Sequence, residues 1–240
     1  MDLKNLAVFL QYIEFAEADP EWDSPNLLLE PATMRKQYEE CLEAVQDVTV
    51  KIAPNKVAIN GREIAYKAVF PKKITRSMRL YKGNNPTEQA FADAQTFSRK
   101  ATGQRKNPKV QDNPDTPADE AAANHSASQQ SYEALLGHLR GLLEMFAADA
   151  KYVTNEPGFS LAELTADADD LEVKNAAVTT TFFPLSNSRI SRDNKMYLNE
   201  NAMFVVQKAY KDYAAGHYGL QDPRYKRLTR LQIQAPRRLR

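Results

Sequence analysis

The sequence is poor in the residues that build disulfide frameworks, metal sites and membrane spans. Its 240 residues include one cysteine, Cys41, and three histidines, which excludes an internal disulfide framework and any multi-cysteine zinc or iron–sulfur site. No run approaches the roughly 18 apolar residues of a membrane span. The opening Met1–Asp2–Leu3–Lys4 is not the start of a basic and then apolar signal peptide. We therefore expect a soluble, cytoplasmic protein without membrane association.

Glycine is scarce as well, with 8 in the whole chain, and alternating apolar and polar residues are almost absent. Both features argue against a sheet protein. Apolar residues instead recur every three or four positions, the spacing of one helical stripe. This is clearest in Leu3, Leu6, Leu10 and Ile13, and again in Tyr132, Leu135, Leu139, Leu142 and Phe146. The predicted fold class is all-α.

Charge is balanced overall, at +1, but it alternates strongly along the chain. Residues 1–47 carry a net charge of −8, and residues 48–109 carry +11. Residues 110–172 carry −11, and residues 173–240 carry +9. An order of acidic, basic, acidic and basic blocks indicates that the chain consists of two related copies.

A short string supports such a duplication. The pattern F-P-x4-R-x2-R occurs twice, 113 positions apart, as Phe70–Pro71 with Arg76 and Arg79, and as Phe183–Pro184 with Arg189 and Arg192. We predict two homologous three- or four-helix units packed as a bundle about a pseudo-twofold axis. The predicted organisation is repeat 1 at 1–105, a polar linker at 106–128, repeat 2 at 129–222 and a basic C-terminal arm at 223–240.

Local signals mark where helices begin and end. Pro71 and Pro184 should each kink a long helix or begin a new one. Third helices are predicted at about 86–102 and 199–215, with Gly103 and Gly216 as C-terminal caps. The segment from Val48 to Ile59 alternates like a hairpin, although we favour helix there.

Three further features have specific expectations. Trp22 and Tyr152 occupy matching loops and should each close one end of a bundle. Cys41 lies on an apolar seam and should be an inert small hydrophobe. The arm after Pro223 contains seven basic and no acidic residues, which predicts either a flexible arm or a strap along an acidic surface.

The basic helices after the Phe-Pro pairs provide the candidate binding residues. They are Arg76, Arg79, Arg189, Arg192, Lys72 and Lys73. Arginines three positions apart project from one helical face, where they could bind a phosphate or a carboxylate. The alternative interpretation, which we favour, is that they pair with the acidic helices of their own copy.

Nucleic acid is a rival ligand for this basic segment. Tyr66, Phe70 and Tyr81 lie among the basic residues, as binding to a single strand would require. The nearly neutral total charge argues against long-range attraction to a polyanion. Aromatic residues in helices also belong to a core more often than to a stacking surface.

No catalytic constellation, metal site or cofactor motif is present in the sequence. The acidic run Asp167, Asp169, Asp170 and Glu172 fails the calcium-loop pattern, because Leu171 stands at its fifth position. On a helix Asp170 would pair with Lys174. We find no phosphate-binding glycine loop and no nucleophile elbow. We therefore expect no enzyme activity, no cofactor and no bound metal.

Three strings resemble an uncharacterised, internally duplicated helical protein family of Bacteroidota. They are the segment from Pro184 to Arg192 with its P-L-S-N-x-R-I-x-R pattern, the segment from Ala94 to Arg105, and Tyr225–Lys226. The chain departs from the family pattern at Ser77 and Met78. The resemblance implies a helical, duplicated bacterial protein and no particular substrate.

Together these features predict a non-enzymatic scaffold or adaptor. Its two copies would present related surfaces to a protein partner or to another copy of the chain, making it an adaptor or a self-assembling structural protein. The alternative is a nucleic-acid-binding protein that uses the basic helices and the C-terminal arm. An enzyme with an unrecognised site is a third and weaker hypothesis.

Overall fold

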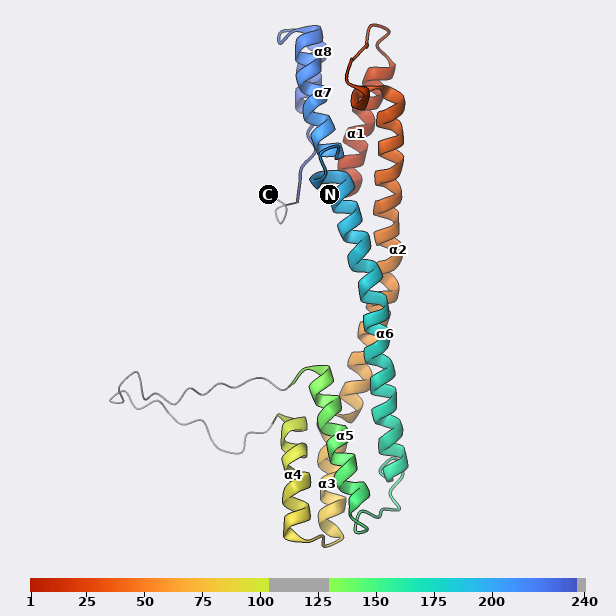
Figure 1. Cartoon of the computed structure of the whole chain (residues 1–240), viewed down its shortest axis with the longest axis vertical. Helices are drawn as coiled ribbons and strands as arrows, with labels where there is room; N and C mark the ends of the chain where they lie inside the picture. The colour runs from red at the N-terminus through yellow and green to blue at the C-terminus, as the bar shows by residue number, and fades with distance from the viewer. Residues whose placement is uncertain (104–129, 237–240) are drawn as a thin grey trace, which may run out of the picture. The chain divides into compact units, whose positions relative to one another are not determined.

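The computed structural model describes residues 1–103 and 130–236, and every regular element in these ranges is helical (Figure 1). In chain order the elements are α1 (Asp2–Glu17), η1 (Leu27–Leu29), α2 (Pro31–Val69), α3 (Lys72–Gly83), α4 (Glu88–Thr102), α5 (Tyr132–Ala148), α6 (Leu161–Asp193), η2 (Asn194–Leu198), α7 (Met203–Tyr218) and α8 (Pro223–Arg230). The predicted all-α fold class is confirmed.

The chain divides into two compact units. Unit 1 comprises Met1–Lys56 with Thr181–Arg240, and unit 2 comprises Val57–Thr180. The long helices α2 and α6 each contribute residues to both units. The units therefore differ from the predicted repeats 1–105 and 129–222, because each core is completed by helices from both halves of the chain. The predicted linker at 106–128 lies outside the described residues.

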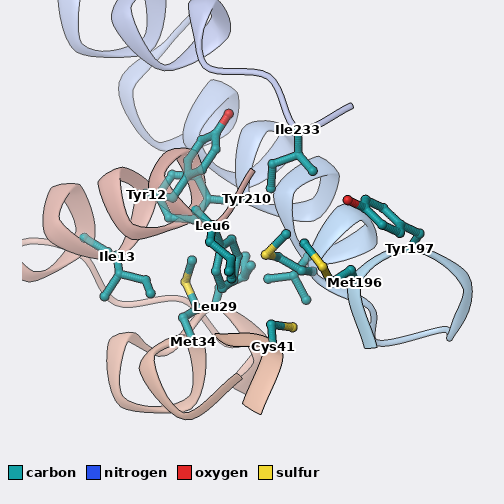
Figure 2. Close-up of a cluster of buried hydrophobic side chains, with 14 of the residues drawn as sticks. Leu6, Tyr12, Ile13, Leu29, Met34, Cys41, Met196, Tyr197, Tyr210 and Ile233 are labelled. Carbon is teal, nitrogen blue, oxygen red and sulfur yellow. The ribbon is translucent and has the colours of Figure 1, made fainter. Parts of the chain in front are cut away.

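The core of unit 1 joins the two ends of the chain. Leu6, Phe9 and Ile13 on one stripe of α1 are at most 2% exposed, and they belong to one cluster with Met34 of α2 and Met203 of α7 (Figure 2). Burying a large apolar side chain contributes about 1.5–3 kcal/mol. Only half of the predicted stripe lies in this core: Leu6 and Ile13 are buried, whereas Leu3 is 66% exposed and Leu10 is half-buried.

The core of unit 2 is built from α3, α5 and the first half of α6. Leu142 and Phe146 of α5 cluster with Ile74 of α3. Helix α4 packs closely on α5 because Gly141 has no side chain at the contact, where a Cβ would overlap the ring of Phe97. This close approach fixes the α3–α4 pair against the unit's core.

The two segments with ambiguous signals have clear structures. Val48 to Ile59 lies inside α2, so the helix that we favoured is confirmed and the hairpin is wrong. Pro71 precedes α3 and begins a new helix. Pro184 lies inside the continuous helix α6, so it begins no helix. The two Phe-Pro pairs therefore occupy different places in the fold.

The predicted glycine caps are half correct. Gly103 caps α4 with a φ of 72°, a left-handed conformation that glycine adopts without strain. Gly216 is not a cap, because it lies inside α7. That helix ends instead at Gly219, which has a φ of 83°.

The turn after α1 in unit 1 and the turn after α5 in unit 2 contain the same hydrogen bonds. The carboxylates of Asp19 and Asp149 each accept a bond from the backbone N–H two residues later, at 3.0 and 2.9 Å. Trp22 Nε1 donates to the Leu29 carbonyl, and the Tyr152 hydroxyl donates to the Phe159 carbonyl. These pairs are 130 positions apart, not 113. The duplication remains a prediction. The similarity between these two turns follows a displacement of 130 positions.

Trp22 and Tyr152 both pack against aromatic rings, as predicted for residues that close a bundle end. The Trp22 ring stacks on Tyr210 at a centroid distance of 4.4 Å. The Tyr152 ring stacks on Phe146 at 3.9 Å. The polar atom of each ring donates to the backbone carbonyl named above.

The C-terminal segment corrects the prediction of a basic arm. Pro223–Arg230 forms α8, and Ile233 and Ala235 beyond it are buried in the core of unit 1. Tyr12 donates a hydrogen bond to the Leu231 carbonyl at 2.6 Å. The described part of this segment packs along an apolar core, because its Leu, Ile and Ala side chains are buried there.

Asn5 should be the polar anchor of this segment. It is 2% exposed, its Nδ2 donates to Tyr197 Oη and to the Gln234 carbonyl at 2.9 Å each, and its Oδ1 accepts from the Gln234 N–H. Asn5→Ala should lower the free energy of unfolding by about 2 kcal/mol, since buried partners lose their bonds. Urea denaturation measures this. Gln11→Ala on the exposed face of α1 should change stability by less than about 0.5 kcal/mol; equal losses for the two variants would refute the anchor.

Candidate anion-binding site

Helix α3 has one apolar face and one basic face. Ile74, Met78 and Tyr81 are buried in the core of unit 2. Lys72, Lys73, Arg76, Arg79 and Lys82 are the basic residues of this helix. Because the apolar residues follow helical spacing, the basic residues are directed to the remaining surface.

Two of the predicted binding residues on α3 are used inside unit 2. Lys73 Nζ forms an ion pair with Asp167, and both side chains are less than 30% exposed. Arg76 lies 2.9 Å from Glu156 and places its guanidinium 4.4 Å from the centre of the Phe159 ring. Both residues are therefore paired inside unit 2. The interpretation that the basic residues pair with acidic helices of their own copy is wrong here, because Glu156 and Asp167 lie in predicted repeat 2.

The second predicted arginine pair lies in unit 1, and its two members behave differently. Arg192 is 12% exposed and contacts the carboxylates of Asp2 and Asp193 at 3.1 and 2.7 Å. Arg189 is exposed, and no carboxylate among the described residues pairs with it. The sequence predicted the same role for both arginines. Their burial differs: Arg192 is a buried structural residue, and Arg189 is exposed.

Arg79 lines a pocket between α3 and α4. The pocket has a volume of about 200 Å³, and its walls carry three cations, Arg79, Lys82 and Arg99. The other lining residues are Thr75, Met78, Phe91, Gln95, Ser98 and Thr102. All are uncharged, so the local potential is positive. The exposed Lys72 does not line this pocket.

The pocket offers several hydrogen-bond donors to an anion. The hydroxyls of Thr75 and Thr102 already donate to helix carbonyls, which leaves the three cations with Ser98 and Gln95 as donors. Lys82 Nζ lies 5.7 Å from the centre of the Phe91 ring, a cation–π distance that helps to hold the ammonium at the pocket. Charge-assisted bonds from such a cluster suit a carboxylate or a phosphate.

Sequence reasoning placed Lys82 in one basic segment with Arg79, and Arg99 in its extension, only as a possible nucleic-acid surface. It missed Ser98 and the local pocket. Arg99 lies in the same basic block as Arg79 but twenty positions further along the chain. Only the hairpin of α3 and α4 brings the two residues to one pocket. The two caps of α4, Thr87 and Gly103, could have revealed the pocket residues of this helix. They fix where the helix begins and ends, and therefore which of its side chains share a face.

The acidic run of α6 is neutralised by neighbouring cations. Arg140 contacts both Asp169 and Glu172, and Lys174 lies 3.5 Å from Asp170, the pair predicted from helical spacing. Across residues 1–103 and 130–236, no group of histidine, cysteine and carboxylate side chains is arranged to hold a metal ion. In the same ranges, no helix is both long and apolar enough to cross a membrane.

A larger hollow, of about 510 Å³, lies in unit 1 between α1 and α8. Its charged residues, Glu14, Asp19, Arg224 and Arg227, have both signs. Asp19 accepts a hydrogen bond from Tyr218, which lowers the pKa of the carboxyl, and Arg224 lies 3.8 Å from it. Arg224 also contacts Asp222. This hollow lacks the uniform charge of the α3–α4 pocket.

The chain was compared with family models, curated proteins and solved structures, and none matches it. The resemblance to a Bacteroidota family therefore stays a prediction.

The contrast between Arg192 and Arg189 should appear in stability. Arg192→Ala removes the buried cation that contacts Asp2 and Asp193, so the free energy of unfolding should fall by about 2 kcal/mol or more. Arg189→Ala should change it by less than about 0.5 kcal/mol, because the side chain is exposed. Thermal and urea unfolding of the two variants measure this. The assignment fails if Arg189→Ala is the more damaging substitution.

Cys41 should be unreactive in the folded protein, as predicted for a buried small hydrophobe. It is fully buried, and burial raises the pKa of its thiol to about 11. Because the thiolate is the reactive form, its fraction at pH 8 is lower in the folded than in the unfolded chain. A thiol reagent at pH 8 should therefore label native protein at least about tenfold more slowly than protein in urea. Equal rates would contradict this burial.

Proposed function

We propose that the protein is a non-enzymatic helical adaptor that binds an acidic segment of a protein partner through the α3–α4 pocket. The observation that carries this proposal is the set of three cations, Arg79, Lys82 and Arg99, around a small pocket whose lining contains no carboxylate. Such a cluster favours negative charge on a ligand. A bacterial, cytoplasmic location is part of the same proposal and is supported by the single cysteine and the sequence resemblance.

A protein partner is favoured over nucleic acid by the distribution of free charge. A polymer of phosphates requires a track of unpaired cations. On α3 this track is interrupted, because Lys73 and Arg76 are paired with carboxylates. Tyr66 and Tyr81, which would have to stack on bases, are 4% and 1% exposed. One local pocket fits the carboxylates of a short peptide better than a long phosphate backbone.

Adaptor activity is also consistent with the rest of unit 2. The α3–α4 pair rests on the unit's core through Ile74 and the close contact at Gly141. The cations therefore project from a packed support, and fewer rotational states are lost on binding than on a mobile segment. Preorganised charge of this kind gives selectivity for anionic ligands.

Binding of a fluorescent oligoglutamate peptide tests the proposal. The full chain should bind the peptide at low salt, and Arg79→Ala with Arg99→Ala should weaken binding about tenfold or more, since two charge-assisted contacts are lost. The matched control is Lys72→Ala with Arg189→Ala, which removes two exposed cations outside the pocket and should change affinity less than about threefold.

A single-stranded oligothymidylate of equal length is the competing probe. Tighter binding of the oligothymidylate, with an affinity that falls steeply as salt rises, would replace the protein-partner proposal with nucleic-acid binding. Equal losses in the pocket variant and its control would show that the pocket is not the site. Circular dichroism and urea unfolding of both variants would confirm that each remains folded.

A further inference from the structure

The three cations of the α3–α4 pocket have no counter-charge among the described residues. Arg79, Lys82 and Arg99 line the pocket, and in the part of the chain that the structure describes no carboxylate forms an ion pair with any of them. This differs from the internal ion pairs of Lys73 and Arg76. Like charges gathered around one small space repel one another, so the pocket favours a ligand that carries more than one negative charge.

A buried hydroxyl in the same pocket also lacks a partner. Ser98 lines the pocket and is 9% exposed, yet its hydroxyl forms no hydrogen bond with any other described residue. The hydroxyls of Thr75 and Thr102, which line the same pocket, donate to carbonyls of their own helices. A buried polar group without a partner costs free energy. The Ser98 hydroxyl therefore suits an acceptor atom of a ligand, and this observation is independent of the charges.

The size of the pocket limits how the negative charge can be supplied. Its volume of about 200 Å³ is below the range of about 300–1,000 Å³ that is usual for pockets of drug-sized ligands. One compact group therefore fits better than several acidic side chains. A carboxylate carries one negative charge on two oxygens, whereas a phosphomonoester carries about −1.5 to −2 at neutral pH on three acceptor oxygens. The phosphomonoester can therefore meet the three cations and the Ser98 hydroxyl more completely.

We propose that the α3–α4 pocket binds a phosphorylated side chain of the protein partner. This proposal rests on the proposed function, because it names the acidic group that the same site takes. Arg79 and Arg99 supply charge-assisted hydrogen bonds, which can be bidentate to phosphate oxygens. Lys82 adds a third cation, and the buried Ser98 adds a neutral donor. The adaptor then binds its partner only after phosphoryl transfer to that partner, so the reaction that must supply this ligand is that of a protein kinase.

Two fluorescent peptides of the same sequence test the proposal, one with a phosphoserine and one with a glutamate at the central position. In phosphate-free buffer at pH 7.5 the full chain should bind the phosphoserine peptide at least about tenfold more tightly, since the ligand gains charge and an acceptor oxygen. Ser98→Ala should weaken binding of the phosphoserine peptide about threefold or more, because one donor is lost. The matched control is Thr179→Ala, which removes an exposed hydroxyl of α6 in unit 2 that does not line the pocket and should leave the affinity unchanged.

Lowering the pH separates a phosphate from other negative groups. The second ionisation of a phosphomonoester has a pKa of about 6, so the affinity for the phosphoserine peptide should fall about threefold between pH 7.5 and pH 5.5. The glutamate peptide stays ionised in this range and reports any effect of pH on the protein itself. The described residues that line the pocket from α3 and α4 include no histidine and no carboxylate.

The outcomes separate this proposal from the proposed function. Equal affinity for the two peptides, or binding of oligoglutamate without binding of the phosphoserine peptide, would overturn the phosphate assignment and leave the proposed function intact. If neither ligand binds, the proposed function fails as well. Inorganic phosphate that displaces the phosphoserine peptide at equal concentration would show a site for the free anion and overturn the assignment to a partner's side chain. Circular dichroism checks that both variants are folded, and the comparison of the two peptides on the unmodified chain stands without them.

Discussion

The structure depends on the sharing of two long helices, α2 and α6, between its two units. Unit 1 needs the first and the last quarter of the chain for one core, and unit 2 is formed by the residues between them. Tyr12 and Asn5 of α1 bind the backbone of residues 231–234, and these bonds connect positions more than two hundred residues apart. The core of unit 2 contains residues of both long helices, and the core of unit 1 contains residues of α2. The length and phase of these helices therefore influence what each unit displays.

This constraint explains why residues of one type have different roles. The basic residues of α3 and α6 look equivalent in sequence, yet Lys73, Arg76 and Arg192 neutralise carboxylates of their own unit. Only residues directed away from those contacts keep free charge. Arg79 keeps a free charge because its pocket contains no carboxylate. Helix α4 contributes Phe91, which lies near Lys82, and a further cation, Arg99. Free charge in a packed support is the physical basis of the proposed adaptor function.

Much of the fold follows from apolar spacing in the sequence, and little of the site does. The stripe of α5, the helical course of Val48 to Ile59 and the cap at Gly103 follow from local physics. The stripe of α1 was only half correct, since Leu3 is exposed. The division into units could not be predicted, because it depends on contacts between distant segments. Pro184 continues α6 where Pro71 begins α3, since tertiary packing outweighs the cost of a proline. The pocket was missed for the same reason: Arg79 and Arg99 meet only through the hairpin.

Hydrogen–deuterium exchange of the full chain, followed by peptide-level mass spectrometry, tests most directly the claim that the α3–α4 pocket binds an acidic segment. Addition of oligoglutamate should slow exchange in residues 75–102 and leave residues 183–198 unchanged. The account would be contradicted if oligoglutamate protected α6 and not the α3–α4 hairpin, or if it protected neither.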